Sequence, residues 1–113
     1  MKKQPRADSV LLDDMMRFCN MIIKYTSGRS FDEFKKDDMC HMAVLHTFVL
    51  LGEASTKVSS DVKSKNPHIP WRDMSDLRNV LVHWYHGVDL SIPWETAKKT
   101  IPGLLNDLSS VLH

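Results

Sequence analysis

An arginine and a histidine five residues apart are the residues of this chain with the clearest chemical potential. Arg78 can hold a phosphate through its guanidinium group, and His83 can take up or release a proton near neutral pH. Asn79, Tyr85 and His86 lie in the same short stretch and add further polar groups. Such a set could cleave a phosphodiester bond in RNA, because RNA carries its own nucleophile in the 2′-hydroxyl.

A purely structural role is the competing interpretation of these residues. Arg78 could pair with a nearby carboxylate, and His83 could be an ordinary surface histidine. An arginine and a histidine at this spacing often occur by chance, so composition and spacing alone favour the structural role. Glu53, which follows Gly52 in an apolar stretch, is the carboxylate that we expect to be partly buried. It could be a structural partner of an arginine, or it could orient Arg78 or a histidine, and both roles stay open.

The elements that must position these residues are helices. Apolar residues recur at intervals of three and four, and the chain has only 4 glycines and 5 prolines, which together predict an all-α bundle. The helix that carries the candidate site should begin at Pro70 or Trp71 and run to Tyr85 or His86. On a helical wheel, its core face is formed by Met74, Leu77, Val80, Leu81 and Trp84.

The opposite face of this helix holds the polar residues. Asn79, His83 and His86 form one row, and Arg78, Val82 and Tyr85 form the row beside it. This wheel places Tyr85 about 20° from Arg78, and it lets an anion held by Arg78 lie near an imidazole.

The remaining elements follow from the same spacing. We expect a helix over residues 9–26 capped by Asp8 or Ser9, and a short helical turn over residues 31–36 opened by a capping box of Ser30 and Glu33. A third helix should begin at Asp37 or Asp38, with apolar residues around most of its circumference, followed by a polar connector. The last segment, residues 90–112, should be kinked at Pro102. Its expected inward residues are Ile92, Trp94, Ile101, Leu104, Leu105, Leu108 and Val111.

Length and charge limit the classes of protein that fit. The 113 residues are enough for a single domain, residues 1–113, and the net charge of +1 means that nucleic acid can bind only through a local patch. The longest apolar run is far short of the ~20 residues of a membrane span, and the first residues are charged rather than an apolar signal core. We therefore expect a cytoplasmic protein without membrane attachment. Cys19 and Cys40 should be buried reduced thiols, with a disulfide between them as the alternative.

Two further groups of residues have weak functional interpretations. Cys40, His41 and His46 do not make a tetrahedral set, so we expect neither a metal site nor a cofactor. The three tryptophans could stack on bases, but Trp84 falls on the core face, and Trp71 and Trp94 lie at helix starts, where aromatic residues close a bundle. Packing in the core is favoured for all three.

A resemblance to a known family covers nearly the whole chain, from residue 11 to residue 108. The segment Asp76-Leu77-Arg78-Asn79-Val80-Leu81-Val82-His83-Trp84-Tyr85 contains arginine, four residues, histidine, one residue and tyrosine. In order along the chain there are also Leu51-Gly52-Glu53-Ala54, Ile69-Pro70-Trp71, Gly87-Val88-Asp89-Leu90 and Trp94-Glu95-Thr96. With these blocks the sequence resembles a HepT-like protein of the HEPN superfamily.

The resemblance implies an antiparallel bundle of four to five helices that works as a homodimer, with the two motif helices lining a shared cleft. It implies the toxin of a bacterial type II, or AMPylation-controlled, toxin–antitoxin pair: a metal-independent endoribonuclease acting on tRNA or mRNA. Arg78 and His83 would be the catalytic pair and Asn79 an assistant. Glu53 and His86 are candidate supporting residues on the ground of their own positions in the sequence, apart from the resemblance. Tyr85 matches the tyrosine that the partner, a minimal nucleotidyltransferase antitoxin, modifies with AMP.

One segment departs from the family pattern. His46-Thr47-Phe48-Val49 stands where relatives often carry Arg-Asn-Leu-Glu, ahead of the Gly-Glu-Ala block. This departure leaves a second function open, in which the chain is a catalytically inactive HEPN interaction module that binds a nucleotidyltransferase partner or a nucleotide.

Overall fold

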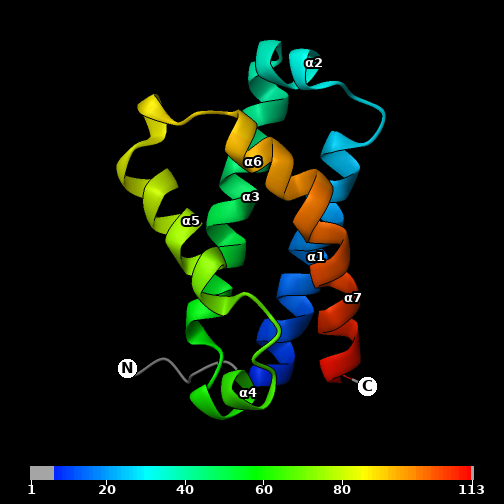
Figure 1. Ribbon diagram of the computed structural model, residues 1–113, viewed down its shortest axis with the longest axis vertical. Helices are drawn as coiled ribbons and strands as arrows, with labels where there is room; N and C mark the ends of the chain where they lie inside the picture. Colours follow the sequence, from blue (N-terminus) through cyan, green and yellow to red (C-terminus); the bar gives the residue numbers. More distant parts are fainter. Residues whose placement is uncertain (1–6, 113) are drawn as a thin grey trace, which may run out of the picture.

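Four helical segments of alternating direction run along the length of the molecule (Figure 1). The computed structural model describes residues 7–112, so the expectation about the first residues of the chain lies outside the described part. The segments are α1 (Asp8–Thr26), α3 (Asp38–Lys57), α5 (Trp71–His83), and α6 (Ser91–Glu95) continued by α7 (Ile101–Leu112). Short helices α2 (Phe31–Lys36) and α4 (Ser60–Lys65) join them, and no strand occurs among residues 7–112. The all-α prediction is confirmed.

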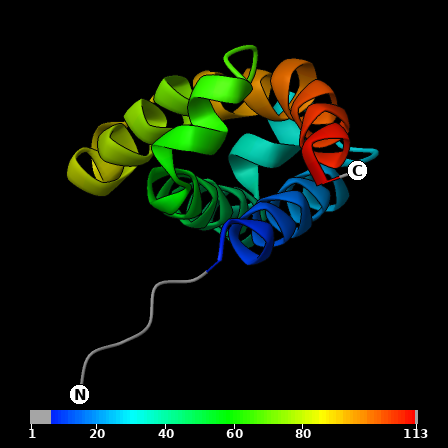
Figure 2. The same cartoon turned by 90° about the horizontal axis from the view of Figure 1, so that it is seen from below.

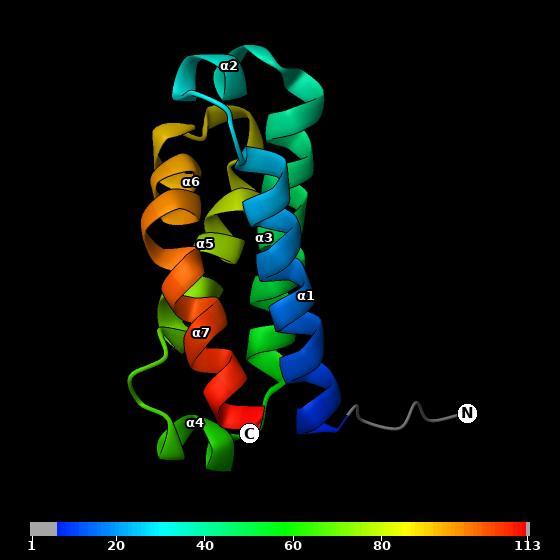
Figure 3. The ribbon, with the colours of Figure 1, turned by 90° about the vertical axis from the view of Figure 1, so that its right-hand side faces the viewer.

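The long helices form two layers. Seen from below, α1 and α3 lie on one side, while α5 and the α6–α7 segment lie on the other (Figure 2). The view from the right shows the same arrangement, with α7 beside α1 (Figure 3). Helix α3 packs against α1 and α5 and also contacts α2 and α6, as its apolar circumference predicts.

Helix α1 buries one side chain per turn against α3 and α7. From Leu12 onward its buried residues recur at intervals of three and four, and each buried leucine, isoleucine or methionine contributes about 1.5–3 kcal/mol by leaving water. The buried set is Leu11, Leu12, Met15, Cys19, Ile22 and Thr26.

The predicted capping box opens α2. Ser30 Oγ accepts a hydrogen bond from the Glu33 backbone N–H at 3.1 Å, and Glu33 Oε1 accepts one from the Ser30 N–H at 3.0 Å. The bond from the Ser30 N–H to the carboxylate holds the pKa of Glu33 below its usual value. The turn presents Phe34 to the core, where its ring lies 5.1 Å from that of Trp94. This contact confirms that Trp94 packs inward.

The prediction that Asp8 or Ser9 caps α1 is wrong. The cap residue is Ala7, which makes no side-chain cap bond. Asp8 instead accepts hydrogen bonds from the N–H and hydroxyl of Ser59, at 2.9 and 2.7 Å, and Ser59 Oγ in turn accepts from the Val62 N–H. The carboxylate therefore joins the start of α1 to the start of α4, because a partner 51 residues away supplies two better donors than its own helix.

The C-terminal segment is interrupted before Pro102. Residues Thr96–Thr100 form a π-helical stretch, η2, in which the Ile101 N–H reaches back to the Thr96 carbonyl. Pro102 has no N–H and its ring crowds the carbonyl four residues earlier, so a widened turn accommodates it. Ile101, Leu104 and Leu108 are buried as predicted, and Trp94, Leu105 and Val111 are partly buried. Ile92 is 55% exposed, so its predicted inward position is wrong.

Both cysteines are free and buried, as the composition predicts. Burial raises the pKa of the Cys19 thiol to about 12, so it is inert as a nucleophile. The Cys40 thiol donates to the Tyr25 carbonyl at 3.4 Å. Across the described residues, no helix has the length and apolar character needed to cross a membrane.

Replacement of Asp8 by asparagine should weaken the protein at neutral pH more than in acid. The bonds from Ser59 lower the pKa of Asp8 below 3.8, so their contribution is fully present above that pH and is lost as the pH falls through the lower folded pKa. Thermal unfolding of the Asp8→Asn variant at pH 7 and pH 3 should show a stability deficit that shrinks in acid. Asp13→Asn, on the exposed side of the same helix, is the control and should show no such change. A deficit independent of pH would contradict this role of the carboxylate.

Candidate active site on helix α5

The start of α5 is fixed by the residues just before it. Ile69 is buried, and its carbonyl accepts from the Trp71 N–H at 2.8 Å. The Trp71 indole N–H donates to the Asn66 carbonyl at 3.0 Å, which ties the helix to the connector. From there Met74 and Leu81 are buried, and α5 lies against α3.

Helices α3 and α5 approach each other closely at Gly52. A Cβ atom there would lie 2.8 Å from the Met74 carbonyl oxygen and closer still to Cβ of Arg78. Only a residue without a side chain permits this approach, because backbone on the facing helix cannot rotate away. Gly52 thus lets the aliphatic stem of Arg78 rest directly on α3.

The guanidinium group of Arg78 is held by two neighbours. Nη2 donates to Glu53 Oε1 at 3.3 Å, and Nη1 donates to Asn79 Oδ1 at 3.0 Å. The Arg78 and Glu53 side chains remain 31% and 42% exposed. An ion pair with this exposure contributes at most about 1 kcal/mol to stability, so its main effect is to orient Arg78. The contact identifies Arg78 as the partner of Glu53, and it is compatible with both roles left open for this carboxylate.

Helix α5 ends at His83, so the prediction that it extends to Tyr85 or His86 is wrong. The Trp84 N–H closes the helix on the Val80 carbonyl, and residues Tyr85–Gly87 form a separate 3₁₀ turn, η1. The segment before it is rich in β-branched and aromatic residues, which are weak helix formers, and glycine follows.

This early end changes where two predicted site residues lie. Tyr85 and His86 leave the helical wheel, so the 20° separation of Tyr85 from Arg78 and the row that joined His86 to Asn79 and His83 are both wrong. Tyr85 is 37% exposed, and its ring meets the His86 ring edge-on at 5.7 Å. Both residues remain next to His83 along the chain.

The predicted core face of α5 is partly wrong. Met74 and Leu81 are buried and Leu77 is partly buried, but Val80 is 46% and Trp84 is 69% exposed. Helix α5 packs mainly on α3, so its apolar stripe is wider than the surface that covers it. Trp71 and Trp94 are partly buried and pack against the core, as predicted.

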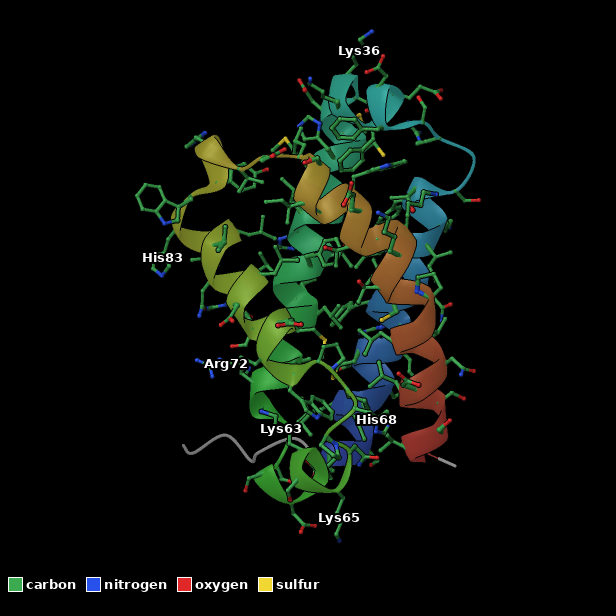
Figure 4. The ribbon with its side chains drawn as sticks, viewed as in Figure 1. Lys36, Lys63, Lys65, His68, Arg72 and His83 are labelled. Atoms are coloured by element: carbon green, nitrogen blue, oxygen red, sulfur yellow. The ribbon has the colours of Figure 1, made fainter. Side chains whose placement is uncertain are left out.

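His83 and Arg78 point in different directions. Figure 4 shows His83 projecting from the outer edge of α5, on the same side as Arg72 and away from the other helices. Five residues along an α-helix correspond to a rotation of about 140° and a rise of about 7.5 Å. Asn79 lies between the two, because it accepts from Arg78 and shares an exposed row with His83, four residues on. The Arg78 guanidinium therefore bonds to a residue that lies one turn before His83 on the exposed row of the helix.

The sequence was compared with known proteins. It matches the family model described as ribonuclease HepT-like over residues 15–111. The chain belongs to this family. A Thermococcus cleftensis protein that carries ribonuclease HepT in its name is 35% identical over 99 residues, which is 88% of this chain and 90% of the relative. A Methanocaldococcus jannaschii protein that carries RNase in its name is 32% identical over 100 residues, 88% of this chain and 92% of the relative. No solved structure matches closely enough to be compared.

Residues 46–49, which we expect to depart from the family pattern, are divided between core and surface in this HepT-like chain. Thr47 and Phe48 are buried, and the Thr47 hydroxyl donates to the Ala43 carbonyl at 2.7 Å. His46 is exposed and lies two turns before Glu53 on the same face of α3. It adds a titratable group to the side of the molecule that holds Arg78. The seven-residue spacing of His46 and Glu53 indicates that the two side chains share a face of α3. It points to the candidate site only once Glu53 is known to contact Arg78.

The residues considered for a metal have other contacts in this HepT-like protein. The Cys40 thiol bonds to Tyr25, and Nδ1 of His41 lies 3.2 Å from the Phe34 carbonyl oxygen. Within residues 7–112, no three histidine, cysteine or acidic side chains are grouped so that they could hold a metal ion.

Alanine at position 52 should disturb the α3–α5 contact. Forcing a methyl group against backbone costs about 1–3 kcal/mol, whereas Gly103, on α7, faces open space. Both substitutions gain the same helix propensity, so the free energy of unfolding of Gly52→Ala should be about 1–3 kcal/mol below that of Gly103→Ala in urea titrations. Equal stabilities would mean that α5 shifts without cost and that Gly52 does not set its position.

Proposed function

We propose that this protein is the RNA-cleaving toxin of a bacterial toxin–antitoxin pair, active as a homodimer. The observation that carries the proposal is the arginine held by Glu53 and Asn79 on the same short helix as the exposed His83. Membership of the ribonuclease HepT-like family, with relatives named as ribonucleases, supports RNA as the substrate.

Arg78 is suited to bind the scissile phosphate. A guanidinium group has five N–H donors, and the bonds to Asn79 and Glu53 use one on each outer nitrogen. Nε is buried and has no hydrogen-bond partner, so the remaining N–H groups of Nη1 and Nη2 are those that can meet phosphate oxygens. Because the two bonds fix the plane of the group, charge that builds up on the phosphate meets donors already in place.

His83 is suited to move the proton. An imidazole acting as base would take the proton of the 2′-hydroxyl as its oxygen attacks phosphorus. The bond from phosphorus to the 5′-oxygen then breaks, and an acid returns a proton to that oxygen. The products are a 2′,3′-cyclic phosphate and a 5′-hydroxyl, so neither a metal nor a redox partner is needed.

The homodimer would bring these two groups together. Arg78 and His83 leave α5 about 140° apart, so a second α5 alongside the first would let a phosphate meet one of these groups from each copy. In a shared cleft between two such helices, Arg78 of one copy and His83 of the other can face the same phosphate. Val82 is 47% exposed between them, which gives the two copies apolar surface on which to meet.

Removal of either group should abolish RNA cleavage while the fold is kept. His83→Ala and Arg78→Ala should each lower the cleavage rate by about 10²–10⁴-fold, because one lacks the proton carrier and the other lacks the phosphate clamp. Both should also relieve growth arrest in cells that express the protein without an antitoxin. His68→Ala and Arg72→Ala replace exposed residues of the same types and should keep most of the activity.

The same assay distinguishes the alternatives. Wild-type cleavage should persist in EDTA, and a 2′-deoxy substitution at the cut site should stop it. Loss of activity in EDTA that a divalent ion restores would refute the metal-free mechanism. A wild-type protein that cleaves no cellular RNA and does not arrest growth would favour an interaction module that only binds its partner.

Tyr85 is the residue that we propose for control by the antitoxin. A nucleotidyltransferase would join the Tyr85 oxygen to the α-phosphate of ATP and release pyrophosphate, while the phenolic proton leaves to solvent. The exposed ring, two residues beyond His83, lies on a turn that an enzyme can approach. A tethered adenylyl group would occupy the cleft beside His83 at high effective concentration and exclude RNA without a large conformational change.

Incubation with ATP and the antitoxin should add adenylyl mass to the peptide that contains Tyr85. Tyr85→Phe should then remain toxic in the presence of the antitoxin, because the acceptor oxygen is missing. Tyr25 is the other of the 2 tyrosines, and Tyr25→Phe should still be modified and neutralised. Modification at another residue, or full neutralisation of a folded and toxic Tyr85→Phe variant, would point to control by direct binding.

A further inference from the structure

An apolar groove runs along the side of α5 that is turned away from Arg78. It consists of two adjoining cavities of about 390 and 320 Å³, which share Leu77, Val80 and Ile92. The first extends to Pro70 and the second to Trp84, so the groove follows the whole length of α5. At 1.5 Å per residue this is about 20 Å, or nearly four turns of a helix.

The groove is open because α5 has a neighbour on one side only. Helix α5 packs on α3 and makes few contacts with α6 and α7. Residues of α3, α6 and α7 nevertheless line the groove together with those of α5. As a result Val80, Trp84 and Ile92 are 46%, 69% and 55% exposed. Apolar side chains gathered in this way along one groove mark a surface that binds another molecule.

The charged residues that line the groove all carry the same sign. They are Asp73, Asp76 and Asp89, and neither cavity is lined by a lysine, arginine or histidine of the described chain. The Asp89 carboxylate accepts bonds from the N–H and hydroxyl of Ser91, at 3.0 and 2.7 Å, which lower its pKa. It is therefore negative throughout the physiological range.

This pattern of charge decides between the classes of occupant. RNA is disfavoured, because three carboxylates repel its phosphates and no basic residue of the described chain lines either cavity. A second copy placed groove to groove about a two-fold axis would set the same carboxylates against each other. We infer that the groove binds an amphipathic helix of a partner protein, with lysine or arginine residues flanking its apolar face.

The groove and the candidate active site occupy different sides of α5. On the helical wheel Leu77 and Val80 lie about 100° and 160° from Arg78, on the side opposite to Asn79. A helix seated in the groove thus leaves Arg78 accessible. The inference does not depend on RNA cleavage, so the two can fail separately.

Two designed peptides test this inference. Both are helical and about 15 residues long, with leucine at every third or fourth position, and they differ only in having lysine or glutamate beside the leucines. In calorimetry at low salt, the lysine peptide should bind at least tenfold more tightly than the glutamate peptide, and added salt should reduce this ratio. Asp73→Asn and Asp76→Asn should lower the same ratio.

Two matched variants locate the binding surface. Val80 and Val82 are 46% and 47% exposed on the same helix, but only Val80 lines the groove. Val80→Asp should weaken binding of the lysine peptide at least tenfold, whereas Val82→Asp should leave it unchanged. Circular dichroism checks that both variants stay folded.

Several results would overturn the inference. These are a dissociation constant weaker than about 1 mM for the lysine peptide, equal affinity for the two peptides, and equal effects of Val80→Asp and Val82→Asp. A dimer in sedimentation that Val80→Asp dissociates would identify a second copy as the occupant. RNA binding that Val80→Asp abolishes would identify nucleic acid.

Discussion

The close approach of α3 and α5 at Gly52 is the constraint on which the candidate site depends. Because α5 is held mainly by α3, the direction of its polar residues is set where these two helices touch. The residue after Gly52 is the carboxylate that holds Arg78, so one turn of α3 provides both the space for the arginine stem and the partner for its head group. Because α5 packs on one side only, its other side is open and forms the apolar groove that carboxylates border.

Those parts of the fold that rest on local signals could be predicted from the sequence. Ser30 and Glu33 form their capping box within one turn, and the α3 cap lies at Asp37, where the pattern placed the start of the helix. The bonds of Asp8 could not be predicted, because its partner lies 51 residues away and only the tertiary fold brings the two together. An aspartate can cap its own helix or accept hydrogen bonds from a residue far away in the sequence. The sequence alone does not show which of these two roles the side chain has.

The candidate site was predictable in composition and less so in geometry. The spacing of Arg78 and His83, together with the family resemblance, singled out these residues as candidates without any knowledge of where the helix ends. The helical wheel then failed at Tyr85, because α5 ends at His83. It also failed at Trp84, because hydrophobicity shows that a side chain prefers to leave water but not whether this chain supplies the surface to cover it. The contact between Glu53 and Arg78 stayed undecided for the same reason, since it joins two helices.

The hydrogen bonds between Asp8 and Ser59 affect the rate at which the native state unfolds. Bonds that close a loop of this length form only after α1, α2 and α3 have assembled from nearer contacts. We therefore expect them to be absent from the transition state for folding, and interactions absent there slow unfolding without speeding folding. These bonds would then slow unfolding at the end of the bundle where α1 begins, the end toward which α3 carries Glu53, the residue that holds Arg78.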